Sequence, residues 1–268
     1  MATLAGLLIA AAGIIGGLLL EGGSIKDISQ LTAALIVLGG TIGAVMVSCP
    51  LPVVLGAGRR WVNVVFEKVQ NPAEVAEEIV GYATKARKNG LVSLEREAEA
   101  IEDPFLRKAL NLAVDGSDMQ DIRKMMELEI FESEDHAEAE AKVFEAAGGY
   151  SPTIGIIGAV LGLIQVMKHL DNIEEVGRGI AVAFVATVYG VAAANIVFLP
   201  SASKMKARAK EETKIREMVV EGVAGIVEGM NPKLIRSKLE AYSRHKASNN
   251  KKAVSAPDAV AAPLESES

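Results

Sequence analysis

Four long runs of residues without a charged side chain constrain this chain more than any other feature of its sequence. The runs are Ala2 to Leu20, Ile28 to Gly58, Gly148 to Met167 and Gly179 to Ser203. A helix of about 20 apolar residues crosses a hydrocarbon core about 30 Å thick, so each run can span a membrane. The second run is longer than one span needs, and we expect Pro50 and Pro52 to end its regular part. The sequence predicts an all-α polytopic membrane protein with four transmembrane helices.

Basic residues near the ends of the runs predict the orientation. Arg59 and Arg60 follow the second run, and four basic residues follow the fourth run within positions 204–210, whereas only Lys26 lies between the first two runs. By the positive-inside rule, residues 59–150 and the chain from residue 201 onward are cytoplasmic. Both termini then lie in the cytoplasm. The first run lacks a positively charged leader, so we interpret it as a retained span rather than a secretory signal.

The polar segments predict a helical domain between the second and third spans. Asn71 and Pro72 have the residue types of a helix start, and Asn89 with Gly90 those of a helix end. A second helix is expected to start near Ser93, with Glu95 in its first turn. After a turn at residues 115–116, a long helix is expected to continue into the third span, and the fourth span to extend inward in the same way.

We therefore expect five segments along the chain. They are 1–55 with transmembrane helices 1 and 2, 56–147 as a cytoplasmic helical domain, 148–203 with transmembrane helices 3 and 4, 204–246 as a cytoplasmic helical tail, and 247–268 as a disordered tail. The last segment is rich in Ala, Pro, Ser and charge and has no periodic apolar face.

The sequence lacks a pattern typical of catalysis. His136, His169 and His245 are far apart in the chain, and no phosphate-binding loop occurs. The single cysteine, Cys49, provides no internal disulfide and is interpreted as a small apolar residue. We expect no enzyme, cofactor, metal or nucleic-acid partner. The four runs also lack a carboxylate, so an ion path would need an ionisable group from a partner.

Small and polar residues inside the runs indicate helix packing instead. Gly155, Gly158 and Gly162 share one helical face, which lets a neighbouring backbone approach closely, and a second group of glycines lies at positions 39–43. General enrichment of glycine in membrane helices is the alternative explanation. Thr187, Tyr189 and Asn195 need hydrogen-bond partners in the fourth run. For the threonine, a bond to the carbonyl one turn earlier would suffice.

Five stretches of the chain are informative when they are taken together and in order. They are "LLLEGGSIKDISQLTAALIVLGGTIGAV", "ARKNGLVSLE", "YSPTIGIIGAVLGLIQVM", "AVAFVATVYGVAAANIVFLPSASKMK" and "GMNPKLIRSKLEAYS". In this order they resemble the MotA subunit of the bacterial flagellar stator, within the wider group of ExbB and TolQ. The resemblance runs from about residue 4 to 244. It implies a multi-pass protein of the bacterial cytoplasmic (inner) membrane, with five copies around two helices of a MotB-like partner. The aspartate of that single-span partner would carry the ion.

The resemblance also implies residue roles. The surface facing the partner helix would include the residues Thr187, Tyr189, Ala159, Gly155, Gly158 and Gly162, with the threonine near the ion. Pro152 and Pro200 match prolines that couple ion flow to cytoplasmic movement, and Arg87 and Glu95 match a charged pair presented to the FliG rotor protein. Lys85 and Lys88 are alternative contributors there. Sodium-driven relatives carry threonine where this chain has Ala159, which favours protons.

Two other functions remain alternatives at this stage. One is an energiser of outer-membrane processes of the ExbB or TolQ type, although those chains usually have three spans. The other is a membrane scaffold that conducts no ions and anchors a helical domain. A partner carrying an intramembrane aspartate would favour the motor over the scaffold.

Overall fold

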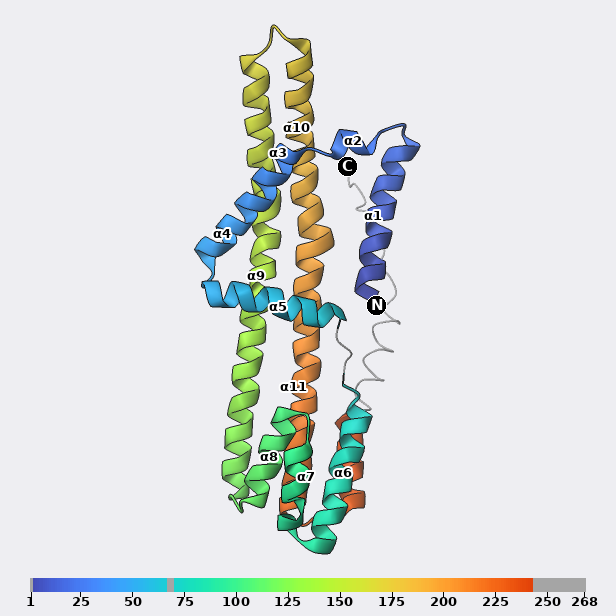
Figure 1. The fold of residues 1–268 in the computed structure, drawn as a ribbon, viewed down its shortest axis with the longest axis vertical. Helices are drawn as coiled ribbons and strands as arrows, with labels where there is room; N and C mark the ends of the chain where they lie inside the picture. The colour runs from blue at the N-terminus through green and yellow to red at the C-terminus, as the bar shows by residue number, and fades with distance from the viewer. Residues whose placement is uncertain (1, 67–69, 243–268) are drawn as a thin grey trace, which may run out of the picture. The chain divides into compact units, whose positions relative to one another are not determined.

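A computed structural model describes residues 2–66 and 70–242, and every regular element in these residues is a helix (Figure 1). The elements are α1 (Ala2–Leu20), α2 (Ile25–Ile28), α3 (Leu31–Ala34), the π-helix η1 (Leu35–Gly39), α4 (Gly40–Ser48), α5 (Leu51–Phe66), α6 (Pro72–Asn89), the 3-10 helix η2 (Leu91–Leu94), α7 (Glu95–Ala100), α8 (Pro104–Val114), α9 (Met119–Lys168), α10 (Ile173–Ala192), the π-helix η3 (Ala193–Phe198) and α11 (Leu199–Val227). Residues 232–242 are also helical. The predicted all-α fold is confirmed; the tail expected to be disordered, 247–268, lies outside the described residues.

Four segments of the described chain are long and apolar enough to cross a membrane, as predicted. The helices that contain them are Thr3–Leu20, Leu31–Ser48, Met119–Lys168 and Ile173–Val227. The second span ends where its prolines predict, because α4 stops at Ser48, Cys49 is extended, and α5 starts a new helix at Leu51. The connection before it forms the short helix α2, with Ser24 as its capping residue.

The two long helices continue beyond their apolar runs, as the sequence predicts. α9 starts after the turn at residues 115–116 and extends for 50 residues, with Pro152 inside it. The fourth span continues from α10 through η3 into α11, and the π turn of η3 ends two residues before Pro200. Proline cannot donate a hydrogen bond to the preceding turn, and a wider π turn accommodates that loss. Neither π-helix follows from the sequence pattern.

The chain forms two compact units, and the first contains the four spans. This span unit comprises residues 2–66 and 131–211 of the described chain. In it, buried Ala33 and Val37 from α3 and η1 pack against Val185 and Ala186 of α10. The amphipathic helix α5 runs across α9 (Figure 1), and its Ala57 packs among buried residues of α9. These contacts place the second span beside the fourth and α5 beside α9.

The second unit comprises residues 70–130 and 212–242 of the described chain and has its own apolar core. Its largest fully buried side chains include Ile79, Leu106, Leu110, Met126 and Met218. The helix expected near Ser93 begins at Glu95, after the 3-10 turn η2, and ends at Ala100. A new helix, α8, then starts at Pro104, because the Asp103 carboxylate accepts hydrogen bonds from the first free backbone N–H groups.

Candidate functional site

The three glycines of the third span lie against α10 of the same chain. A Cβ atom at Gly155 would be 2.9 Å from the carbonyl oxygen of Ala186, and one at Gly158 would be 2.8 Å from the Cβ of that alanine. At Gly162 it would be 2.8 Å from the carbonyl oxygen of Gly179. The face predicted to receive a neighbouring helix therefore receives α10, and we call this contact the glycine seam. Contact of these glycines with a partner helix stays a prediction.

Two residues that the sequence analysis did not single out complete the glycine seam. A Cβ atom at Gly190 would lie 2.5 Å from the carbonyl oxygen of Ser151, the closest approach of the two backbones along the seam. The Ser151 hydroxyl is fully buried and donates a 3.0 Å hydrogen bond to the Gly190 carbonyl. The only sequence signal was a serine before a proline inside an apolar run. Pro152 itself is half-buried and follows this contact directly.

The polar side chains of the fourth span find partners inside the chain. The Thr187 hydroxyl donates to the Ala183 carbonyl one turn earlier at 3.3 Å, and Asn195 binds the Val191 carbonyl at 2.9 Å. The Tyr189 hydroxyl donates to the Ile28 carbonyl and accepts a 3.4 Å hydrogen bond from the Gln30 N–H. Tyr189 thereby ties the connection before α3 to α10. The local bond of the threonine is the alternative that the sequence left open.

The remaining residues predicted for the ion path and for coupling are distributed along the two helices. Ala159 is half-buried on α9 next to the seam glycine Gly158. Pro200 is exposed in the first turn of α11, just beyond η3. Thr187 lies near Gly155, since a Cβ at that glycine would be 3.4 Å from the threonine Cα. The structure thus brings the threonine to the seam, whereas Pro200 lies about three turns further along the chain from the Gly190 contact.

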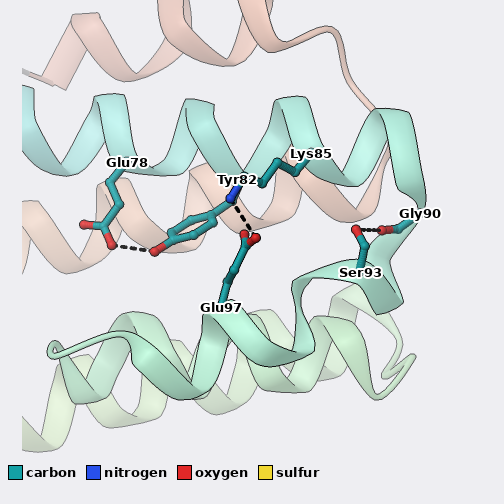
Figure 2. Close-up of polar contacts among 6 residues, drawn as sticks. All are labelled: Glu78, Tyr82, Lys85, Gly90, Ser93 and Glu97. Carbon is teal, nitrogen blue, oxygen red and sulfur yellow. Dashed lines mark hydrogen bonds and ion pairs between the residues drawn. The ribbon is translucent and has the colours of Figure 1, made fainter.

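Arg87 and Glu95 lie on either side of a turn in the second unit. Arg87 is in the last turn of α6 and Glu95 is the first residue of α7, and both side chains are exposed. Gly90 between them has φ of +82°, a conformation that L-residues with side chains rarely adopt. The Ser93 hydroxyl donates a 2.6 Å hydrogen bond to the Gly90 carbonyl (Figure 2). The turn therefore holds the two charges at adjoining helix ends.

The neighbouring lysine is engaged in an ion pair. Lys85 Nζ lies 2.6 Å from Glu97 Oε1, and the Tyr82 hydroxyl donates to Glu78 at 2.7 Å (Figure 2). Burial and the adjacent Glu78 carboxylate raise the pKa of Tyr82. These residues border a cleft of about 550 Å³ whose lining also includes Glu102. Lys85 is exposed but paired with Glu97, whereas Arg87 and Lys88 are exposed in the last turn of α6.

Among residues 2–66 and 70–242, no three histidine, cysteine, aspartate or glutamate side chains are placed to hold a metal ion. His136 is exposed, and His169 lies 3.3 Å from Glu175. His245 lies outside the described residues. Cys49 is partly buried against the α5 and α9 contacts, in keeping with its apolar interpretation.

Comparison with known proteins identifies the family. Residues 4–89 match the motility protein A N-terminal family, and residues 97–218 match the MotA/TolQ/ExbB proton channel family. Motility protein A of Bacillus subtilis is 37% identical over 244 residues, which cover 90% of this chain and 89% of that protein. Chemotaxis protein PomA of Vibrio alginolyticus is 34% identical over 90% of this chain and 94% of its own length.

Solved structures agree with these sequence matches. A chain in the structure of C. jejuni MotAB superimposes with a TM-score of 0.85 at 33% identity, covering 90% of this chain and 94% of that chain. A chain of the flagellar MotAB stator complex from Bacillus subtilis gives a TM-score of 0.83 at 36% identity, covering 90% and 96%. The chain belongs to the motility protein A family of flagellar stator subunits, within the MotA/TolQ/ExbB proton channel family.

Proposed function

We propose that this chain forms an ion channel with a MotB-like partner and couples ion flow to torque on the flagellar rotor. One observation carries the proposal: the four apolar runs of a proton channel family member contain no Asp, Glu, Lys or Arg. An ionisable group inside a membrane usually marks an ion path. That group must therefore come from a second chain, and the MotAB complexes among the solved relatives support a MotB-like source.

In this proposal the chain is a multi-pass protein of the bacterial inner membrane with both termini in the cytoplasm. Residues 1–55 and 148–203 form the membrane part, and residues 56–147 and 204–246 the cytoplasmic part. Five copies surround two partner helices, each helix carrying one essential aspartate. The Thr187 side of the glycine seam faces the partner, and the absence of a hydroxyl at Ala159 favours protons over sodium, which needs oxygen ligands.

Coupling to the rotor uses two further features. Pro152 and Pro200 weaken the helices at the ends of the spans, since each removes a backbone donor from the helical ladder. Exposed Arg87 and Glu95 engage a FliG-like rotor protein. Contacts between exposed charges are individually worth about 0 to 1 kcal/mol, which suits a contact that forms and releases repeatedly.

Ion flux together with motility tests this function. The chain and its MotB-like partner are expressed in a flagellated strain that lacks its own stator, and proton influx and swimming are recorded. We expect both, and we expect both to disappear when the partner's intramembrane aspartate is replaced by asparagine. Influx without swimming would favour an ExbB-like energiser. No influx from a complex that is present in the membrane would favour a passive scaffold and refute the proposal.

A further inference from the structure

Helix α5 makes polar contacts with both long helices of the span unit. Arg60 and Glu140 of α9 form an ion pair, with side chains only 22% and 20% exposed. The next residue, Trp61, donates a 2.8 Å hydrogen bond from its indole N–H to the Ser201 hydroxyl. Ser201 is 6% exposed, so this bond joins α5 to a buried position on α11.

Aromatic packing supports the same contact. The Trp61 ring stacks against Phe144 of α9 with centroids 6.3 Å apart and an interplanar angle of 21°. Phe144 in turn lies 6.4 Å from Phe198, the last residue of η3. Gly56 allows the Glu140 side chain to approach α5, because a Cβ atom there would collide with that carboxylate. We call Arg60, Trp61 and their partners Glu140 and Ser201 the α5 clamp.

The position of the α5 clamp relative to the prolines is informative. Ser201 directly follows Pro200, and Phe198 precedes it by two residues. Phe144 and Glu140 lie about two to three helical turns before Pro152. Proline residues are the usual points at which a helix bends. On α9 the clamp contact lies before Pro152, and on α11 it lies after Pro200. The clamp therefore connects the parts of the two helices that lie beyond the prolines, away from the glycine seam.

We propose that Trp61 is a positioning residue that makes α9 and α11 move together when either helix bends at its proline. The inference rests on the proposed function, because it concerns how movement in the spans reaches the rest of the chain. The Trp61 ring fixes the lateral position of α5 against Phe144 of α9. The indole N–H fixes the position of α11 along its axis through the bond to Ser201. Without that hydrogen bond, α9 and α11 are held only by their direct contacts, the Glu145–Lys206 ion pair at 2.9 Å and the packing of buried Ala141 with Met205. The two helices then move together less closely, and ion passage produces less rotation.

Two conservative variants test the hydrogen bond. Trp61→Phe keeps an aromatic ring against Phe144 and removes the donor, whereas Ser201→Ala removes only the acceptor. Losing one partner of such a bond shifts the balance between joined and separate helices by about fivefold. We expect membrane level and proton influx to stay near wild type, and rotation speed per unit influx to fall by about two- to fivefold. The double variant should be no worse than either single variant, because all three lack the same bond.

Ser48→Ala is the matched control, since its hydroxyl contacts only nearby residues of its own segment, the Val45 carbonyl at 3.1 Å and the Cys49 sulfur at 3.7 Å. It should leave rotation per unit influx unchanged. Trp61 is the only tryptophan of the chain. Its emission, measured with a tryptophan-free partner, should change in Ser201→Ala and not in Ser48→Ala, which a general loss of stability would not reproduce.

Unchanged rotation per unit influx in both conservative variants would overturn the inference. If Trp61→Phe fails to assemble, Ser201→Ala decides the question, because it removes a single hydroxyl. A wild-type complex that conducts no ions would refute the proposed function instead. In that case the emission of Trp61 alone judges the clamp, and an unchanged spectrum in Ser201→Ala overturns it.

Discussion

The closest approach in the glycine seam gives the sharpest prediction for stability. Replacing Gly190 with alanine adds one methyl group, which would lie 2.5 Å from the Ser151 carbonyl oxygen, 3.1 Å from the Gly155 Cα and 3.2 Å from the Pro152 Cα. Carbon and oxygen atoms without a bond between them rarely come closer than about 3.3 Å. The two backbones must therefore separate by about 0.8 Å at this level. All three atoms that block the methyl group belong to the backbone, so a change of rotamer cannot relieve the collision.

The magnitude follows from three contributions. Overpacking of this kind costs about 1 to 3 kcal/mol. The separation also stretches the 3.0 Å bond from the Ser151 hydroxyl to the Gly190 carbonyl beyond hydrogen-bonding range, and such bonds between membrane helices contribute about 0.6 kcal/mol on average. Alanine favours a helix over glycine by up to about 1 kcal/mol, which offsets part of the loss. We expect Gly190→Ala to destabilise the span unit by about 1 to 3 kcal/mol.

Titration of the purified complex with a denaturing detergent, followed by Trp61 emission, measures this loss. Gly190→Ala should unfold at a lower detergent fraction than wild type. Gly155→Ala should show a smaller shift, since its closest contact would be 2.9 Å. Gly17→Ala is the control, because a Cβ atom there has no other atom within 4 Å. Equal midpoints for Gly190→Ala and Gly17→Ala would show that the close approach of α9 and α10 does not limit stability.

Three further predictions concern charge. The ion pair with Lys238, and to a smaller extent the one with Arg123, lowers the pKa of Glu221. The ionised carboxylate therefore stabilises the second unit at a pH above the ordinary carboxylate pKa of about 4.3. This stability is lost as the pH falls below that value. Glu221→Gln should therefore lower thermal stability at pH 7 by about 1 to 3 kcal/mol, with a difference from wild type that shrinks towards pH 3 in the same melting assay. Arg87→Glu should reduce swimming while the membrane level of the protein and the proton influx stay normal. The measurement is swimming speed in strains that combine Arg87→Glu with single charge reversals on the rotor protein, and at least one reversal should restore it. If no reversal restores swimming, steering by this residue is excluded. Swimming should follow the proton gradient, and speed that follows external sodium at fixed pH and membrane potential would contradict the prediction from Ala159.

The fold could be predicted where a structural feature depends on neighbouring residues in the sequence. Uncharged length predicts a span, and Asn71 with Pro72 predicts a helix start that the structure confirms, with the Asn71 side chain accepting from the Ala73 N–H. The π turns could not be predicted, because they depend on the packing of α3 against α10 and on the position of Pro200 rather than on residue preference. The docking of α5 across α9 was missed for the same reason. Its contacts join residues about 80 to 140 positions apart.

The candidate site was predictable in its residue types and less so in its partners. A glycine face indicates close approach, but periodicity does not say which helix approaches, and in the structure α10 of the same chain occupies it. Ser151 was missed because a hydroxyl gains meaning only from the carbonyl opposite it, which belongs to a residue 39 positions away. The turn between Arg87 and Glu95 was predictable from the glycine that ends α6, and both side chains are exposed. Their contact with a rotor stays a prediction.

The glycine seam and the α5 clamp together limit where the span unit can bend. From Ser151 to Gly162, the backbones of α9 and α10 touch directly, so these two helices behave as one rigid pair. The α5 clamp joins α9 to α11 at Glu140 and Ser201, and its Trp61 ring also stacks on Phe144 of α9. On α9, residues 145–150 lie between these two rigid contacts and lead directly to Pro152 at the end of the seam. On the other helix, η3 and Pro200 lie between Gly190 and Ser201. Bending is cheapest in these two intervals, because each already lacks a regular α-helical hydrogen bond. A push on the Thr187 side of the seam would therefore move the clamp as a unit rather than distort the spans, which is the movement that a coupling role for Pro152 and Pro200 requires.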